Sequence, residues 1–241
     1  MAERARIQKA IAHAGLMSRR KAEEAVAAGR VRLDGRPAVL GDRVDVDAQT
    51  LTLDGVPLPL NPGLETHLLY KPVGVISSAT DPRGRPTVVD LIDSDMRLYP
   101  VGRLDARSEG LILVSNDGEL ANRVTHPRYG IAKKYLARVE GRPSGRGLRA
   151  LIEGVELEDG PARASAARLI AAHDDRSLVE LVMVEGRNRQ VRRMMAAIGH
   201  EVGDLVRTAI GPLTDRRLRA GESRVLAPAD VRRLMEAGGR R

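Results

Sequence analysis

The strongest constraint on the fold is a series of short apolar runs after residue 64, several of which follow one another without a helical segment between them. Parallel neighbours in a sheet need a long crossover connection, usually a helix, whereas antiparallel neighbours do not. We therefore predict an α+β fold with a mixed, mainly antiparallel sheet and flanking helices, rather than a doubly wound parallel sheet. The expected strands are 68–70, 73–76, 111–114, 135–139, 164–170 and 178–184, and the expected helices are 119–124, 147–153, 190–198 and 229–237.

The first 60 residues show the pattern of a small α/β domain. Apolar residues at helical spacing predict a helix over 7–14, which Gly15 ends. Ser18 is a suitable N-cap for a second helix that continues to residue 28. Short apolar runs next to Asp-Gly turns predict a small antiparallel sheet. Its expected strands are 31–33, 44–46 and 51–53.

A proline-rich stretch follows this segment, with Pro57, Pro59, Pro62 and Gly63 within seven residues. Such a composition is typical of a semi-stiff linker or a domain boundary. We therefore expect two domains. The small one comprises residues 1–60, including the start of the linker, and the larger one comprises residues 64–241.

The charge of the chain favours a polyanionic partner. Lys and Arg number 40 against 32 Asp and Glu, a net charge of +8, and no polybasic amphipathic helix indicates a membrane surface. Basic residues gather at the start of the second helix and beside the first strand, where cations oppose the helix dipole, so phosphates are the expected ligand. A merely solvated surface is the alternative. The candidate phosphate-binding residues here are Arg19, Arg20, Lys21, Arg30 and Arg32.

Several classes of function are disfavoured by composition. The chain has no cysteine, which excludes disulfides and thiolate chemistry and is compatible with a reducing cytoplasm. Aromatic residues are only 2%, without Phe or Trp, which argues against a broad base-stacking platform. The five histidines are dispersed, so we expect no metal site, and there is no Walker loop, dinucleotide fingerprint or serine-hydrolase elbow. No signal peptide or spanning segment is evident, so we expect a soluble, cytoplasmic protein.

Asp105 lies in the stretch that carries the clearest chemical signal. It is flanked by Arg103 and Arg107, bracketed by Gly102 and Gly110, and followed at once by an apolar run. The glycines indicate a backbone that turns tightly or is approached closely. Neighbouring guanidinium groups favour the charged carboxylate that a nucleophile or general base requires. A salt-bridged surface loop is the alternative interpretation.

Two further stretches carry possible binding residues. Four arginines occupy seven positions at the start of the helix expected at 190–198, where they could bind phosphates, pair with Asp105, or be ordinary surface residues. Tyr135 opens a predicted strand and is either a core aromatic or a flat surface for one base. The four arginines are Arg187, Arg189, Arg192 and Arg193.

Four motifs follow one another along the larger domain. They are Lys71-Pro-Val-Gly, then Gly102-Arg-Leu-Asp105 with Ser108-Glu-Gly-Leu and Asn116-Asp-Gly, then Lys134-Tyr135, and then Glu185-Gly-Arg-Asn-Arg-Gln-Val-Arg192-Arg. Together they closely resemble the ribosomal RNA pseudouridine synthases of the RsuA/RluB type, and the stretches 81–87, 118–123 and 156–161 look most like the RluB branch. The first domain resembles the small αL RNA-binding domain of a ribosomal protein. Ser108, Ser115 and Met195 depart from the usual motif residues without removing a catalytic group.

The resemblance implies an enzyme that detaches a uracil from its ribose, rotates it and rejoins it through carbon. Asp105 would be the nucleophile, with attack on either the sugar or the base left open. Tyr135 would pack against the base, Arg192 would pair with Asp105, and Lys71 would belong to the substrate-binding set. Arg103 would contact the RNA left behind when the uridine is flipped out or already looped. Arg187 and Arg189 would anchor RNA nearby.

The resemblance also implies partners. No cofactor is required, and the expected partner is ribosomal RNA, of the large subunit, free or in a pre-ribosomal particle, with no membrane partner and a monomeric enzyme. A non-catalytic RNA-binding or ribosome assembly factor is the main alternative, which would not need Asp105. A glycosidic hydrolase is a third reading. It would normally need two cooperating carboxylates, and Glu109 is the one close acidic neighbour in sequence.

Overall fold

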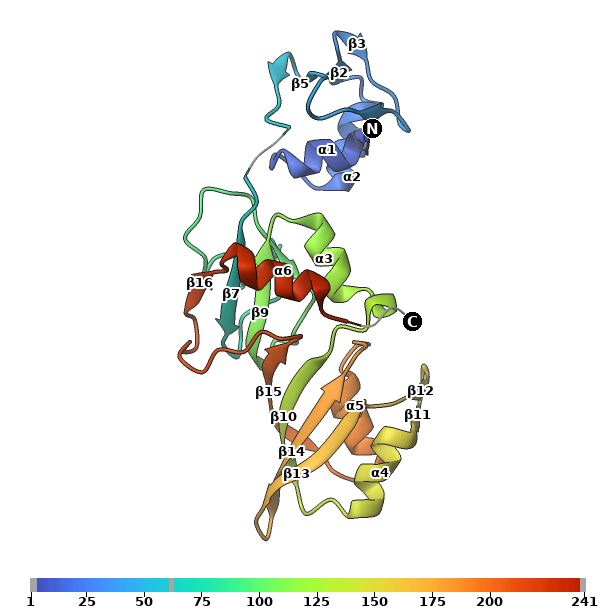
Figure 1. The fold of residues 1–241 in the computed structure, drawn as a ribbon, viewed down its shortest axis with the longest axis vertical. Helices are drawn as coiled ribbons and strands as arrows, with labels where there is room; N and C mark the ends of the chain where they lie inside the picture. The colour runs from blue at the N-terminus through green and yellow to red at the C-terminus, as the bar shows by residue number, and fades with distance from the viewer. Residues whose placement is uncertain (1–3, 61–62, 239–241) are drawn as a thin grey trace. The chain divides into compact units, whose positions relative to one another are not determined.

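The protein is described by a computed structural model covering residues 4–60 and 63–238, which separate into two compact units (Figure 1). The N-terminal unit contains Met1–Glu65 with Ser94–Leu98 and Asn116–Gly118. The C-terminal unit contains Thr66–Asp93, Tyr99–Ser115 and Glu119–Arg241. The N-terminal unit has one buried apolar cluster and the C-terminal unit has two, and each unit is described separately below.

The N-terminal unit is a helix pair beside short strands, as predicted, but the strand expected at 44–46 covers Arg43–Val44 and does not belong to the sheet of the strands at 31–33 and 51–53. Helices α1 (Ile7–His13) and α2 (Arg19–Ala27) pack together through their apolar sides. The Ser18 side chain caps α2 by accepting a hydrogen bond from the backbone N–H of Lys21. A four-stranded sheet has the order β3-β2-β5-β6, and β1 pairs with β4. The strands are β1 (Ala5–Arg6), β2 (Val31–Leu33), β3 (Arg36–Pro37), β4 (Arg43–Val44), β5 (Leu51–Leu53) and β6 (Val56–Pro57).

The C-terminal unit is built on an eight-stranded sheet with the order β13-β14-β10-β15-β9-β7-β16, and β8 also pairs with β9. Every pairing in it is antiparallel except that of β15 with β9, which confirms the predicted α+β fold with a mainly antiparallel sheet. The strands are β7 (Thr66–Lys71), β8 (Tyr99–Val101), β9 (Glu109–Ser115), β10 (Lys133–Glu140), β13 (Ala166–Ala172), β14 (Arg176–Met183), β15 (Val202–Ile210) and β16 (Ser223–Val225).

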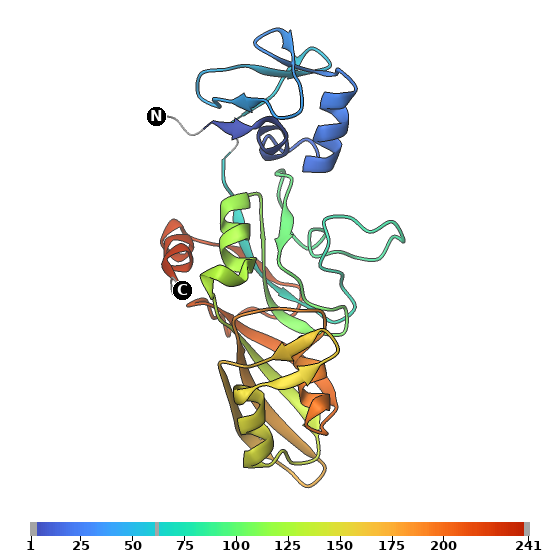
Figure 2. The same cartoon turned by 90° about the vertical axis from the view of Figure 1, so that its right-hand side faces the viewer.

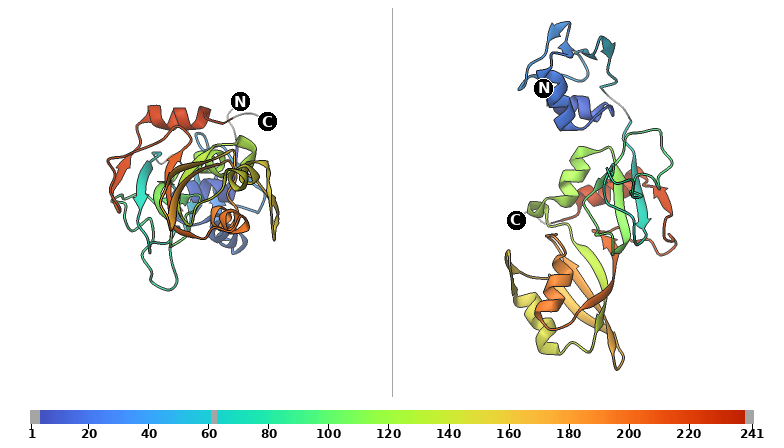
Figure 3. Two further views of the ribbon diagram at one scale, coloured as in Figure 1. Left: turned by 90° about the horizontal axis from the view of Figure 1, so that it is seen from below. Right: turned by 180° about the vertical axis from the view of Figure 1, so that it is seen from behind.

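Four helices stabilise the two halves of this sheet. Helices α3 (Gly118–Thr125) and α6 (Pro228–Glu236) share an apolar cluster with β7 and β9, and Figure 1 shows them beside these strands. Helices α4 (Gly145–Glu153) and α5 (Gln190–Ala197) share a second cluster with β10 and β14, as the rear view of Figure 3 shows. None of the helices within residues 4–60 and 63–238 combines the length and apolar character needed to cross a membrane.

Smaller elements complete the unit. A short 3-10 helix, η1 (Pro127–Tyr129), follows α3, and the hairpin of β11 (Val155–Leu157) and β12 (Gly160–Ala162) follows α4. Residues 72–93 leave the sheet after β7 as a long loop, which is teal to green in Figure 2. Within this loop the Asp81 carboxylate accepts hydrogen bonds from the backbone and side chain of Arg85.

Two sequence expectations for this unit were wrong. Residues 73–76 are a turn rather than a strand, with Gly74 at φ +91°, and Ile76 makes only an isolated bridge to Thr87. Strand β15, which lies in the middle of the sheet, was not predicted. Asp204 and Arg207 interrupt its apolar pattern, and register shifts against β10 break the two-residue alternation on which strand prediction rests.

Candidate active site

A cavity of about 330 Å³ is lined by residues of β10 and β15, by the loop before β9 and by the segment that enters α5, and it brings together residues that are far apart in sequence. Arg103, Asp105, Tyr135 and Arg189 all line it, as does Arg187, so the predicted loop, strand and helix start meet in one place. The volume lies at the lower end of the usual range for small-ligand sites. The cavity therefore suits one nucleoside better than a large cofactor.

Asp105 lies on a loop whose backbone is held at every position. The carbonyl groups of six consecutive residues accept hydrogen bonds from six different groups of the C-terminal unit. The pairs are Arg103 O with Arg207 Nη1 (3.3 Å), Leu104 O with Ser77 Oγ (2.9 Å), Asp105 O with Ser108 N (3.0 Å), Ala106 O with Gly74 N (2.7 Å), Arg107 O with Arg192 Nη2 (3.1 Å) and Ser108 O with Lys71 Nζ (2.7 Å). The loop is thus preorganised before any ligand binds.

Three of these donors are buried cations. Lys71, Arg207 and Arg192 have exposed fractions of 0%, 4% and 9%. Burial lowers the pKa of Lys71 to about 8, an effect that the carboxylates of Asp105 and Glu109 partly oppose. Burial also lowers the pKa of Arg192, and Arg189 adds to this while Asp105 opposes it. Cations that donate to carbonyls behind the loop favour negative charge on its cavity side.

The predicted pairing of Asp105 with Arg192 is wrong as a direct ion pair. Within the described residues the Arg192 guanidinium donates to the carbonyls of Val202 (2.5 Å), Gly203 (3.0 Å) and Arg107 (3.1 Å) and forms no ion pair with Asp105. Its influence on Asp105 is instead through space and through the position of the loop. The family resemblance implied that the two residues pair, but the carbonyls that compete for Arg192 became known only from the fold.

Lys71 also has a different place from the one predicted. It was expected to contact substrate, but the side chain is fully buried and its Nζ donates to the carbonyls of Pro72 (2.8 Å) and Ser108 (2.7 Å). A group without exposed surface beneath the loop supports Asp105 rather than touching a ligand. Lys71 is therefore a positioning residue.

The arginine cluster expected to bind RNA near the site is partly committed to the protein. Arg187 donates to the carbonyls of Asp159 (3.2 Å) and Gly160 (3.0 Å) and forms an ion pair with Asp159, so it holds the β11–β12 hairpin. Arg193 donates to both carboxylate oxygens of Asp159. Arg189, in contrast, is exposed at the cavity and has φ +47°, and its guanidinium has no hydrogen-bonded partner in the described part of the chain.

The basic residues of the N-terminal unit also include some that are free and some that are bound to other groups of the protein. Arg19, Arg20 and Lys21 are exposed at the start of α2. Arg30 is bound to Asp54 through an ion pair of 2.5 Å, and the Arg32 guanidinium donates to the Gly35 carbonyl at 3.0 Å. The first three are therefore the better candidates for contacts with phosphate.

Two cavity residues were missed by sequence reasoning. Arg207 donates through Nε to the Leu111 carbonyl at 2.7 Å and lies opposite Tyr135 in the sheet. Its strand comes so close to β9 that a Cβ at Gly110, which has φ +105°, would collide with the Arg207 backbone. Lys133 donates to the Val124 carbonyl at 2.7 Å, and burial, helped by Arg207, lowers its pKa to about 8. Neither residue carries a local sequence signal of its partner, because the carbonyls that they bind lie in other segments of the chain.

The arrangement leaves the Asp105 carboxylate available for chemistry. The side chain is half-buried in the cavity and has no hydrogen-bonded partner among the described residues. Tyr135 supplies a half-buried ring in the same cavity. A carboxylate held on a rigid loop beside an aromatic surface can attack, or take a proton from, a flat ligand that packs against that ring.

Comparison with known proteins agrees with this geometry. The family model for RNA pseudouridylate synthase matches residues 65–197, and that for the S4 domain matches residues 5–49. Ribosomal large subunit pseudouridine synthase B of Bacillus subtilis (strain 168) is 44% identical over 95% of each chain. The Salmonella typhi protein of the same name is 39% identical over 86% of this chain and 74% of that one. A crystal structure of pseudouridylate synthase covers 95% of this chain and 99% of its own, with 29% identity and a TM-score of 0.68. The chain belongs to the RNA pseudouridylate synthase family and carries an N-terminal S4 domain.

Proposed function

We propose that this protein isomerises a specific uridine of large-subunit ribosomal RNA to pseudouridine. The observation that carries the proposal is the fully hydrogen-bonded loop that presents Asp105 to the cavity shared with Tyr135. The Bacillus subtilis relative, which aligns with 95% of this chain, is named as a ribosomal large subunit pseudouridine synthase. The reaction keeps all atoms and the oxidation state of its substrate, so it needs no cofactor.

The chemistry requires that the bond between ribose C1′ and uracil N1 breaks and that a bond between C1′ and C5 forms. The electron pair of the first bond stays with the uracil, N1 gains a proton and C5 loses one. We assign Asp105 the role of nucleophile, either at C1′ or at the base, in a cavity where buried cations support its charge. Tyr135 packs against the base, and Arg103 contacts the RNA from which the uridine is flipped.

The N-terminal unit serves RNA binding in this proposal. The match to the S4 domain and the exposed cations Arg19, Arg20 and Lys21 support it. Phosphate contacts of this kind add affinity without reading sequence. We infer a monomeric enzyme that acts in the cytoplasm on free ribosomal RNA or on a pre-ribosomal particle.

The deciding experiment maps pseudouridine in ribosomal RNA from cells that lack this protein and then restores one variant at a time. We expect one or a few uridines to lose the modification, and the wild type to restore it. Asp105→Asn keeps the shape of the side chain but removes its charge, so it is expected to restore nothing. Asp204→Asn is the matched control, because Asp204 is 62% exposed and pairs with Arg138 on the surface.

Two outcomes would contradict the proposal. If Asp105→Asn restores the modification, Asp105 is not the nucleophile. If the deletion changes no pseudouridine but lowers the yield of large subunits, the protein is a non-catalytic assembly factor. That second outcome would leave the fold and the RNA-binding role of the S4 domain intact.

A further inference from the structure

Two basic residues of the Asp105 cavity lie beside Tyr135 on the same face of the sheet. Arg207 of β15 is the register partner of Tyr135, and Lys133 lies two positions before Tyr135 in β10. Residues two apart in a strand point to the same face. All three line the cavity, so a flat base that packs against the Tyr135 ring would have both cations at its edge.

Neither cation is neutralised by a carboxylate. In the described part of the chain, Lys133 and Arg207 form no ion pair. The carboxylates that line the cavity are Asp105 and Glu185, and Glu185 already forms an ion pair with Arg187. Burial and the like charge of Arg207 lower the pKa of Lys133 to about 8, which leaves Lys133 mostly protonated at neutral pH. Two cations thus share one wall of the cavity without a paired carboxylate among the described residues.

Both cations also keep hydrogen-bond donors that the protein does not use. The Lys133 ammonium has three N–H donors and places one on the Val124 carbonyl at 2.7 Å. Arg207 donates through Nε to the Leu111 carbonyl (2.7 Å) and through Nη1 to the Arg103 carbonyl (3.3 Å). The Nη2 of Arg207 is buried and has no hydrogen-bond partner among the described residues. A buried donor without an acceptor costs free energy, which a ligand oxygen would recover.

We propose that Lys133 and Arg207 donate hydrogen bonds to the carbonyl oxygens of the target uracil and stabilise the negative charge that the reaction places on the base. The proposal rests on the proposed function. If the Asp105 carboxylate attacks C1′, an O–C1′ bond forms, the C1′–N1 bond breaks, and its electron pair leaves with the uracil, where N1, O2 and O4 share the charge. If the carboxylate attacks C6, an O–C6 bond forms and the π pair of the C5–C6 double bond moves to O4. In both cases the charge reaches an oxygen at the edge of the base.

The position of the two cations favours the base over a phosphate. They lie in the wall of a cavity that suits one nucleoside, beside the ring on which the base packs. Uracil is neutral when RNA binds and becomes charged only as bonds rearrange, so donors aimed at its oxygens lower the barrier more than they raise affinity. A phosphate is charged from the start, so a phosphate contact would appear in the affinity instead.

The test measures the single-turnover rate constant of pseudouridine formation and the Kd of RNA, with a transcript that contains the uridine identified by the mapping above. Lys133 carries the test, because Arg207 also holds the Asp105 loop. Lys133→Gln removes the charge but keeps an N–H that can donate to the Val124 carbonyl. We expect its rate constant at saturating RNA to fall about 100-fold and its Kd to stay within about twofold of wild type. Lys133→Arg keeps the charge and should restore the rate constant to within about tenfold of wild type.

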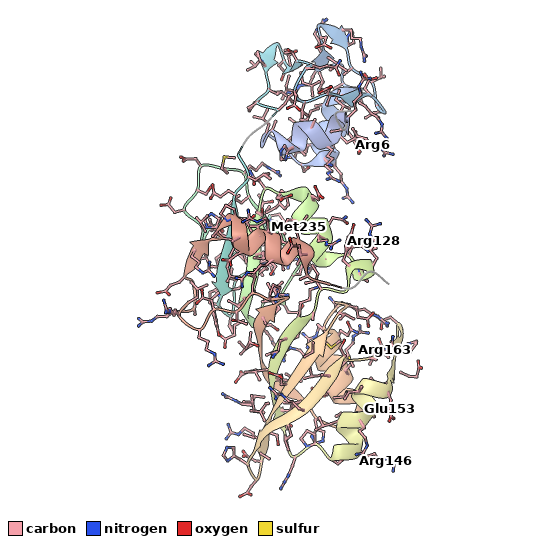
Figure 4. All side chains as sticks on the ribbon, in the orientation of Figure 1. Arg6, Arg128, Arg146, Glu153, Arg163 and Met235 are labelled. Carbon is pink, nitrogen blue, oxygen red and sulfur yellow. The ribbon has the colours of Figure 1, made fainter. Side chains whose placement is uncertain are left out.

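Two controls remove the same charge elsewhere in the C-terminal unit. Lys134 is the neighbour of Lys133 on the other face of β10, lies outside the cavity lining and forms an ion pair with Glu180 at 3.6 Å. Arg146 is exposed on α4 and also lies outside the cavity lining (Figure 4). Lys134→Gln and Arg146→Gln should each leave the rate constant within about twofold of wild type.

Three outcomes would overturn the proposal. A rate constant of Lys133→Gln close to that of wild type would show that its charge does not act on the base. A raised Kd with a lower salt dependence, at an unchanged rate constant, would make Lys133 a phosphate contact. Equal losses in Lys133→Gln and Lys133→Arg would show that the shape of the side chain matters rather than its charge. If the wild type itself forms no pseudouridine, the proposed function fails instead.

Discussion

Two arginine-rich stretches of the C-terminal unit use their residues in opposite ways. In the loop from Arg103 to Ser108 three of the six backbone carbonyls are bound by buried cations from elsewhere, while the side chains of Arg103 and Arg107 remain exposed. In the stretch 187–193 three of the four guanidinium groups are bound to carbonyls or carboxylates of the protein itself. In the first stretch the backbone accepts hydrogen bonds from cations of other segments, whereas in the second stretch the arginine side chains donate hydrogen bonds to other segments.

The difference teaches that a count of arginines in a motif does not give the number available to a ligand. A guanidinium has five N–H donors, and a buried one is stabilised by each donor that it places on an acceptor. Loop carbonyls near the active site are such acceptors, which is why Arg192 binds Arg107 O rather than the carboxylate of Asp105. Whether an arginine side chain is available to RNA depends on its exposure and on its hydrogen-bond partners in the folded protein.

The strongest test of this comparison removes a buried cation. Arg207→Met would leave the carbonyls of Arg103 and Leu111 without their donor, and a buried acceptor that loses its partner costs about 1–3 kcal/mol. We expect the free energy of unfolding to fall by about 4 kcal/mol, measured by urea denaturation, and kcat to fall more than tenfold because the Asp105 loop loses its support.

The matched control for this prediction is Arg138→Met. Arg138 is 57% exposed and forms a surface ion pair with Asp204 at 2.8 Å, so its loss should cost no more than about 1 kcal/mol. Equal losses of stability for the two variants would show that Arg207 does not hold the loop in the way its hydrogen bonds indicate.

A smaller effect is expected from the protonation of Lys71. Its pKa is about 8 in the folded protein against 10.5 for an ordinary lysine, so between these values the unfolded chain binds more protons at this position. Stability of the wild type relative to Lys71→Met should therefore rise with pH across that window, by up to about 3 kcal/mol, and stay level below it. Urea denaturation of both proteins from pH 7 to 10.5 measures this difference.

Lys133 has a pKa shifted in the same direction to about 8, but it is present in both proteins and its contribution cancels in the comparison. Parallel stability curves for wild type and Lys71→Met would mean that Lys71 is not protonated in the way its burial implies. The support of the Asp105 loop would then come from the two arginines alone.

Much of the N-terminal unit followed from local sequence. Apolar spacing and the Ser18 cap predicted α1 and α2 because both depend on residues within a few positions of each other. In the C-terminal unit the runs that became β9 and β14 were found for the same reason, since they are apolar or alternate regularly. The main failures were β15 and the turn at 73–76, whose conformations are set by distant partners, and the short strands β8, β11, β12 and β16 were not predicted either.

The residues of the candidate site show the same contrast between features set by local sequence and features set by distant partners. Asp105 and Tyr135 were identified because their motifs are local, and the structure brings both into one cavity. The roles of Lys71 and Arg192 were not predictable, because they depend on which carbonyls lie within reach after folding. Arg207 was missed altogether, since a basic residue in a strand shows no local sign of the loop it binds.

The smallest effect is expected at the surface of the N-terminal unit, where the same distinction between free and bound cations applies. Replacing Arg19, Arg20 and Lys21 together with Gln should weaken RNA binding about fivefold and lower the salt slope by about 2, if each contacts one phosphate. Stability should change by less than about 1 kcal/mol, because all three side chains are exposed.

Arg30→Gln is the comparison that sharpens this last prediction. Arg30 is 51% exposed, but its guanidinium is bound to Asp54, so a phosphate would have to displace that carboxylate. We therefore expect its loss to change RNA affinity less than twofold at the same salt concentration. A drop as large as that of the triple variant would mean that surface ion pairs in this unit do not withhold arginines from RNA, because exposed pairs of this kind are weak enough to exchange partners.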